Sequence, residues 1–254
     1  MLPAGSLKEQ REAWVSKYLT NFLLMKPRSK KYRKSMETIV SDETSSLSDA
    51  FQKISKFEKA NFDETVEVSC SMGVDPKQSS QGVRGTVNLP HGSGKEVRVI
   101  VFTENADDAK AAGADHAGLD DLISKVKEGW MDFDVAISTT DAMKSVRSIA
   151  RVLGPRGLMP TPKAGTVTDN IAEVIKLVKA GRVEFKMDKT GALAVIVGKR
   201  SFANQQLEEN TVAALNAISE SRPDGFKGKF VKTVFVSSSM SPSVKINTSL
   251  VNIN

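Results

Sequence analysis

The 254-residue chain is poor in the residues that build disulfides, zinc sites and aromatic clusters. It has one cysteine, Cys70, two histidines and 6% aromatic residues. A single cysteine excludes an intramolecular disulfide, and with two histidines it leaves too few soft ligands for a structural zinc site. No apolar run approaches the roughly 18 to 20 residues that a membrane-spanning helix needs. We therefore expect neither a bound metal nor a membrane partner.

What the chain does contain is typical of a folded protein. Hydrophobic residues make up 40% of the sequence and charged residues 26%. This length and composition allow one large domain or two small ones, each with its own core. The net charge of +6 hints at an anionic partner.

The positive charge is concentrated at the N-terminus. Residues 1–36 carry nine basic and two acidic residues, a net charge of +7, and the rest carries 27 basic and 28 acidic residues, a net charge of −1. Basic blocks are usually solvated tails and often hold nucleic acid; a targeting or solubilising extension is the alternative. Within this extension, residues 9–25 have the apolar spacing of a helix.

The two ends of the remaining chain have the pattern of an α+β domain. Residues 37–50 read as a loop, and Ser46 or Ser48 is expected to cap a helix through Phe57. Residues 207–218 predict another helix. Strands are expected where apolar and polar residues alternate, at 62–68, 84–90, 183–187, 192–197, 230–236 and 244–246. Because residues 188–191 form a turn sequence, 183–197 predicts a β-hairpin.

The middle of the chain alternates strands with helices. Residues 97–102 and 135–139 are mostly apolar, as in strands buried on both faces of a parallel sheet. Helices are expected at 106–113, 119–127, 143–153 and 169–180. The fold class is therefore α/β and α+β in two domains. We expect a basic N-terminal extension at 1–36, a discontinuous α+β domain at 37–93 and 185–254, and an inserted α/β domain at 94–184.

No convincing catalytic set emerges. Residues 91–96 resemble the end of a phosphate-binding loop, but Leu89 and Glu96 stand where that loop needs Gly and Ser or Thr. No G-x-G-x-x-G follows the strand at 97–102, where a dinucleotide site would need it. A nucleotide-using enzyme is thus the disfavoured alternative, and we expect no cofactor.

Several stretches carry a more specific resemblance. They lie at 82–92, 129–134, 153–160 (LGPRGLMP), 162–167, 188–191 and 238–240. Together they closely resemble the bacterial-type family of large ribosomal subunit protein one, over roughly residues 48–247. The resemblance implies a discontinuous domain that binds large-subunit rRNA and an inserted Rossmann-like domain. It also implies a mobile stalk that assists release of deacylated tRNA from the exit site.

The resemblance also implies which residues contact RNA. The rRNA-binding positions would be Phe62, Thr65, Asp188, Ser239, Met240 and Ser241. Further cations available for RNA contact are Lys77, Arg84, Lys189 and Lys227. Asn61 and Gln78 stand where the family usually has Lys and Arg, which predicts two fewer phosphate contacts. Ser241 stands where the family usually has Gly, so a positive φ there would be strained.

The implied partners are large-subunit rRNA, exit-site tRNA and neighbouring ribosomal proteins. Bacterial members of the family also repress their own messenger, and this activity stays open here. The additional N-terminal segment favours an organellar ribosome, with the mitochondrial matrix as first choice. The plastid stroma and the bacterial cytoplasm are the alternatives.

Overall fold

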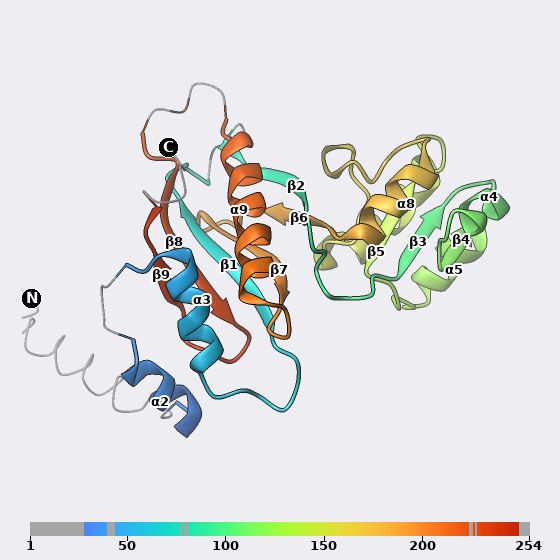
Figure 1. The fold of residues 1–254 in the computed structure, drawn as a ribbon. Helices are drawn as coiled ribbons and strands as arrows, with labels where there is room; N and C mark the ends of the chain where they lie inside the picture. The colour runs from blue at the N-terminus through green and yellow to red at the C-terminus, as the bar shows by residue number, and fades with distance from the viewer. Residues whose placement is uncertain are drawn as a thin grey trace, which may run out of the picture.

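The computed structural model describes residues 28–39, 44–76, 78, 81–223, 226 and 228–248. The helix expected at 9–25, and the candidate RNA contacts Lys77 and Lys227, lie outside the described residues. Within them the architecture is mixed α/β, as the sequence predicts, with helices and three sheets (Figure 1). None of the described helices combines the length and the apolar character needed to cross a membrane.

The described elements follow one another along the chain with these bounds. The helices are α2 (Lys30–Glu37), α3 (Leu47–Lys56), α4 (Ala106–Ala111), α5 (Asp120–Lys127), α6 (Met143–Val146), α7 (Ala150–Leu153), α8 (Ile171–Ala180) and α9 (Asn204–Glu220). The 3₁₀ turns are η2 (Arg147–Ile149), η3 (Gly154–Arg156) and η4 (Pro162–Ala164). The strands are β1 (Thr65–Met72), β2 (Arg84–Asn88), β3 (Val99–Phe102), β4 (His116–Gly118), β5 (Val135–Ser138), β6 (Arg182–Lys186), β7 (Ala192–Lys199), β8 (Val231–Ser238) and β9 (Val244–Ile246).

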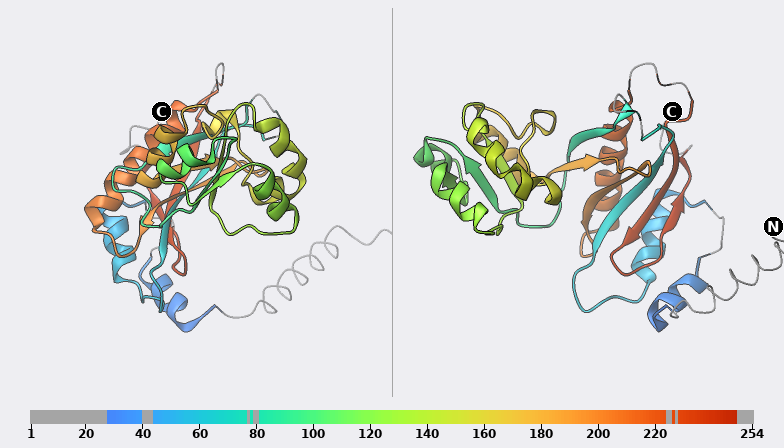
Figure 2. Two further views of the ribbon diagram at one scale, coloured as in Figure 1. Left: turned by 90° about the vertical axis from the view of Figure 1, so that its right-hand side faces the viewer. Right: turned by 180° about the vertical axis from the view of Figure 1, so that it is seen from behind.

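The largest sheet is antiparallel and has its helices on one face. Its strand order is β7-β1-β8-β9. Alternate residues of β1, among them Val66, Val68 and Cys70, are buried in a core that includes residues of α3 and α9. No helix of the described part covers the opposite face, which is turned toward the viewer in the right-hand view of Figure 2. The residues of this core come from 50–89 and 185–246.

Burial of Cys70 leads to a direct test of this core. The side chain is 2% exposed, and burial raises the pKa of its thiol to about 12. Because the thiolate is the reactive form, we expect the native chain to resist a disulfide reagent at about pH 8 and the urea-unfolded chain to react. Absorbance of the released thiol measures this, and rapid labelling of the native chain would contradict the packing of β1.

The second sheet is parallel, as the apolar runs in the middle of the sequence predict. Its order is β4-β3-β5, and β3 pairs in parallel with both neighbours. The four residues of β3 are all buried because successive side chains enter two different cores. Val99 and Val101 pack with residues of α4 and α8, and Ile100 and Phe102 pack with residues of α5, α6 and α7.

The predicted hairpin at 183–197 is wrong. The turn exists, because Asp188 N donates to Ala192 O at 2.8 Å. The strands on either side of it, however, enter different sheets: β6 pairs with β2, and β7 pairs with β1. Turn residues specify a reversal of the chain, whereas strand partners depend on which distant strand completes a buried face. Strands β2 and β6 run side by side between the two larger sheets (Figure 1).

Four other local features differ from the sequence-based expectations. The strand expected at 62–68 begins at Thr65 and runs to Met72, because residues 60–64 are turned by a hydrogen bond from Ala60 N to the Glu64 carboxylate. The helix expected at 143–153 is broken by η2. Helix α2 lies within the segment read as a solvated extension, with Ser29 as its N-cap. The three-residue strand β4 was not expected from the sequence.

Candidate nucleic-acid interface

One end of the large sheet brings together two candidate segments that are far apart in the sequence. Thr65 N donates to Ser239 Oγ at 3.1 Å, and Ser239 N donates to Thr65 O at 3.0 Å. These bonds follow from the antiparallel pairing of β1 with β8, in which Val66 faces Ser238. The start of β1 and the turn after β8 therefore form a single surface.

Phe62 and Met240 present large apolar side chains on this surface. Phe62 is 57% exposed and Met240 is 61% exposed, more than any other large apolar side chain in the described part. Phe62 precedes β1, so its alternation with the strand is not a sign of burial. Two large exposed apolar side chains are therefore found on neighbouring segments that are joined by the hydrogen bonds between Thr65 and Ser239.

Ser241 closes the turn after β8. Its Oγ accepts from Ser238 N at 3.0 Å and donates to Pro242 O at 3.0 Å. Its backbone N donates to Ser238 O at 3.1 Å. Ser241 stands where glycine is usual and was expected to be strained at a positive φ. In the structure its side chain contributes a hydrogen bond that stabilises the turn.

Asp188 lies at the other end of the sheet. In the pairing of β1 with β7, Thr65 faces Lys199 and Ser71 faces Ala192. Thr65 and Ser71 are six steps apart along β1, about 20 Å at the rise of a strand. The structure therefore does not bring Asp188 together with Phe62 and Met240; it places them at opposite ends of the same sheet.

The Asp188 carboxylate is used within its own turn. It accepts from Thr190 Oγ1 at 2.6 Å, from Thr190 N at 2.7 Å and from Ala192 N at 3.1 Å. These bonds, the first of them above all, hold the pKa of Asp188 below its ordinary value. Lys189 is exposed in the same turn. Arg84, on the neighbouring strand β2, forms an ion pair with Glu184 at 2.5 Å.

The open face of the sheet joins the two ends. The β1 residues on this face alternate with the buried ones, and their partners on β7 and β8 share it. The face carries small, polar and a few apolar residues: Glu67, Ser69, Ser71, Ala192, Ala194, Ile196, Thr233, Phe235 and Ser237. The sequence reasoning named none of these as site residues, although the period-two pattern of β1 contains the signal.

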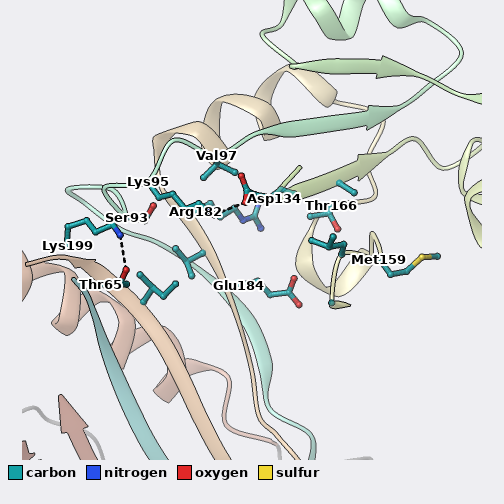
Figure 3. A pocket seen from close by; sticks show the side chains of 16 residues that line it. Thr65, Ser93, Lys95, Val97, Asp134, Met159, Thr166, Arg182, Glu184 and Lys199 are labelled. Atoms are coloured by element: carbon teal, nitrogen blue, oxygen red, sulfur yellow. Dashed lines mark hydrogen bonds and ion pairs between the residues drawn. The ribbon is translucent and has the colours of Figure 1, made fainter. Parts of the chain in front are cut away.

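A cavity of about 310 Å³ lies beside Thr65 (Figure 3). Lys199 Nζ donates to Thr65 Oγ1 at 2.8 Å on one side of it, and Lys95 Nζ pairs with Asp134 Oδ1 at 2.6 Å on another. Arg182 also lines the cavity, and its Nη2 donates to Thr86 Oγ1 at 2.9 Å. The lining thus contains three basic residues, Lys95, Arg182 and Lys199, and two acidic ones, Asp134 and Glu184. No group of acids, histidines and cysteines suited to a metal occurs among the described residues.

Comparisons with known proteins agree with the resemblance read from the motifs. The model of the Ribosomal protein L1p/L10e family matches residues 54–242. Large ribosomal subunit protein uL1 of Kosmotoga olearia is 47% identical over 225 residues, which cover 88% of this chain and 97% of the relative. The protein of the same name from Thermus thermophilus is 46% identical over 226 residues, 88% of this chain and 99% of the relative. The chain therefore belongs to the Ribosomal protein L1p/L10e family.

Proposed function

We propose that the chain is a structural constituent of the large ribosomal subunit that binds large-subunit rRNA and forms the stalk assisting release of deacylated tRNA. The observation that carries the proposal is the pair of exposed apolar side chains, Phe62 and Met240, on two hydrogen-bonded segments at one end of the open sheet. The family is structural rather than enzymatic, so the relatives give no support to a nucleotide-using enzyme.

The chemistry of this surface suits folded RNA. RNA is recognised by its shape, its phosphates and 2′-hydroxyls, and by stacking of unpaired bases on aromatic side chains. Phe62 offers a stacking face, Met240 an apolar contact for a ribose or base, and Thr65 and Ser239 offer hydroxyl groups. Ser241, Asp188, Lys189 and Arg84 are the remaining described candidates. The face of the sheet between the two groups carries no described helix, which allows both groups to contact one RNA.

We also propose that the chain comprises two domains, 37–93 with 185–254 and the inserted segment 94–184. In support, the core of the large sheet draws on residues 50–89 and 185–246, and the two cores of the parallel sheet draw on residues 99–178. Strands β2 and β6 connect them.

Equilibrium binding of the full chain to fragments of large-subunit rRNA tests the function. We expect tight, saturable binding to one fragment with a helical junction and weaker binding to an unbranched stem of equal length. Equal affinity for both would contradict site-specific rRNA recognition, and the same titration with a free nucleotide tests the enzyme alternative.

Helix α2 extends the positive charge toward the RNA surface. Lys31 Nζ donates to Lys59 O at 3.0 Å, and Lys34 pairs with Glu58 at 2.9 Å. Both contacts reach the segment that leads to Phe62. Lys30 and Arg33 are exposed on the same helix. This supports a role for the basic N-terminal segment in contacting rRNA phosphates.

Replacing Lys30 and Arg33 by glutamine is therefore expected to lower the salt dependence of rRNA binding. Each lost phosphate contact reduces the slope of log affinity against log salt by about 0.7 to 0.9, without a change in melting temperature. Lys110 and Lys176, exposed on α4 and α8, serve as the control pair. An unchanged slope would show that α2 does not contact rRNA phosphates.

Deletion of residues 1–29 extends the test to the rest of the basic segment. We expect this deletion to weaken retention of the protein on ribosomes at raised salt.

The inserted segment has a cationic face of its own. Residues 142–168 contain five basic and no acidic residues, whereas the rest of 94–184 contains eight basic and 14 acidic residues. Lys144, Arg147 and Arg151 have the spacing of one helix face, and the opposite face is buried through Val146, Ile149 and Leu153. Among the described residues none of these three cations forms an ion pair. We propose that this face meets the exit-site tRNA.

Replacing Lys144, Arg147 and Arg151 by glutamine is expected to reduce crosslinking of the protein to deacylated tRNA on ribosomes severalfold, because phosphate contacts are lost. Binding to the rRNA fragment should stay unchanged. The corresponding changes at Lys110, Lys125 and Lys127 are the control. Loss of rRNA binding instead of tRNA crosslinking would contradict this assignment.

We further propose an organellar, mitochondrial compartment, which the basic segment preceding the family match supports; plastid stroma and bacterial cytoplasm are the other outcomes. Cell fractionation with identification of the co-purifying rRNA decides among them.

Repression of the chain's own messenger is a second activity that the same RNA surface supports, and binding to that messenger in competition with rRNA tests it.

A further inference from the structure

A buried ion pair lies directly behind the proposed rRNA surface. Arg200 Nη1 and Glu64 Oε1 are 3.0 Å apart, and their side chains are 6% and 1% exposed. Arg200 directly follows β7, and Glu64 directly precedes β1. Neither residue belongs to the positions implied by the family resemblance, and neither is exposed enough to contact RNA.

Arg200 connects this pair to the end of helix α3. Its Nη2 donates to Ile54 O at 2.9 Å and to Phe57 O at 2.5 Å. The last carbonyls of a helix lack partners within the helix, and a cation there also interacts favourably with the helix dipole. Arg200 therefore fixes the point at which the chain leaves α3 toward Phe62.

Glu64 connects the pair to both halves of the RNA surface. Its Oε1 accepts from Ala60 N at 2.8 Å, and its Oε2 accepts from Ser238 Oγ at 2.5 Å. Burial alone would raise the pKa of Glu64, but these hydrogen bonds and the charge of Arg200 outweigh it and lower the pKa below its ordinary value. The carboxylate thus stays ionised and holds the segment around Phe62 and the turn around Met240.

Stability alone does not account for this arrangement. Desolvating two charges offsets most of their attraction, so an apolar pair of similar size is often as stable. Arg200 Nε is also buried without a hydrogen-bond partner among the described residues. What an apolar pair could not supply is the set of directional hydrogen bonds that Glu64 accepts from Ala60 and Ser238.

We propose that Arg200 and Glu64 are positioning residues for the rRNA site, which hold Phe62 and Met240 in the geometry that RNA recognises. The inference rests on the proposed function. On this inference, the positions of Phe62 and Met240 are fixed by one buried ion pair and not by contacts among the surface residues themselves.

The test compares Arg200→Met, Glu64→Gln and the double variant with the unchanged chain. All measurements are made well below the lowest melting temperature, on the same rRNA fragment. The double variant removes both charges, so it should recover much of the stability that Arg200→Met loses by leaving a carboxylate unpaired. Its affinity for rRNA should nevertheless stay about ten-fold weaker, because glutamine has one acceptor oxygen and cannot accept from both Ala60 and Ser238 as the carboxylate does.

Two readouts separate positioning from a purely structural role or a direct contact. Amide hydrogen exchange should quicken at Thr65 and Ser239, whose amides hydrogen-bond across the two segments, but not at Thr190, in the turn at the other end of the sheet. The salt dependence of binding should not change, because no phosphate contact is removed. Arg98→Met, which breaks the ion pair with Asp134, is the control and should leave rRNA affinity intact.

The outcomes distinguish this inference from the proposed function. If the unchanged chain does not bind the rRNA fragment, the function fails. If it binds and the double variant binds equally well, the positioning role is overturned. A slope reduced by about one would make Arg200 a direct phosphate contact and would also overturn it. Should Arg200→Met not fold, Arg200→Lys, which keeps the charge but cannot bridge Glu64 and two carbonyls, gives the same comparison.

Discussion

Replacing Phe62 and Met240 together by alanine is expected to weaken rRNA binding about 100-fold. A base stacked on Phe62 contributes about 1 to 3 kcal/mol, and burial of the Met240 side chain contributes about 1.5 to 3 kcal/mol. Losses at the lower part of these ranges amount to about 100-fold in affinity. Because both side chains are more than half exposed, truncating them leaves no cavity in the core. The melting temperature should therefore stay close to that of the unchanged chain.

Val212→Ala provides the control for this prediction. Val212 is 39% exposed on α9, on the helical side of the sheet and away from the turn after β8. Its truncation removes exposed apolar surface without touching the proposed site, so rRNA affinity should not change. If the Phe62 and Met240 double variant binds rRNA as tightly as the Val212 variant, the end of the sheet that carries Phe62 and Met240 is not the recognition surface.

Replacing Gly181 by alanine is expected to destabilise the chain by about 3 kcal/mol or more. Gly181 ends α8 at φ +114°, and a Cβ on it would lie 2.4 Å from Gly92 Cα. The backbone conformation alone costs a side chain about 1 to 3 kcal/mol, and the overlap with Gly92 forces backbone to move in addition. Urea unfolding measures the loss.

Gly129→Ala separates these two effects. Gly129 has a similar φ of +102°, and it too follows a helix, but a Cβ there meets nothing within 4 Å. Its replacement should cost only the backbone part, about 1 to 2 kcal/mol. Equal losses at the two glycines would mean that the close approach of residues 92 and 181, where the chain enters and leaves the inserted segment, is not a constraint on the fold.

The elements that the sequence predicted best are those whose signal is local. The mostly apolar run at 97–102 predicted a strand buried on both faces, and β3 is the middle strand of a parallel sheet. Ser46 was one of two predicted caps and is the N-cap of α3. Periodicity and capping act within a few residues, so they can be read without knowledge of the rest of the chain.

The sequence predicted only part of the candidate site. The motifs identified Phe62, Met240 and Asp188, but not that the first two share one end of the sheet and Asp188 lies at the other. Thr65 and Ser239 are 174 residues apart, and only the pairing of β1 with β8 joins them. The roles of Glu64 and Arg200 were not evident from the sequence, because charged residues are usually solvated.

By itself, the sequence determined the mixed α/β character, the position of the excess positive charge and the family of this protein, because composition, periodicity and motifs are properties of short segments. The tertiary structure decided that the strands around Asp188 enter different sheets, that no described helix covers one face of the large sheet, and that Glu64 and Arg200 form a buried ion pair. Each of these depends on which distant segments bury one another. That choice is made by packing over the whole chain and not by any segment alone.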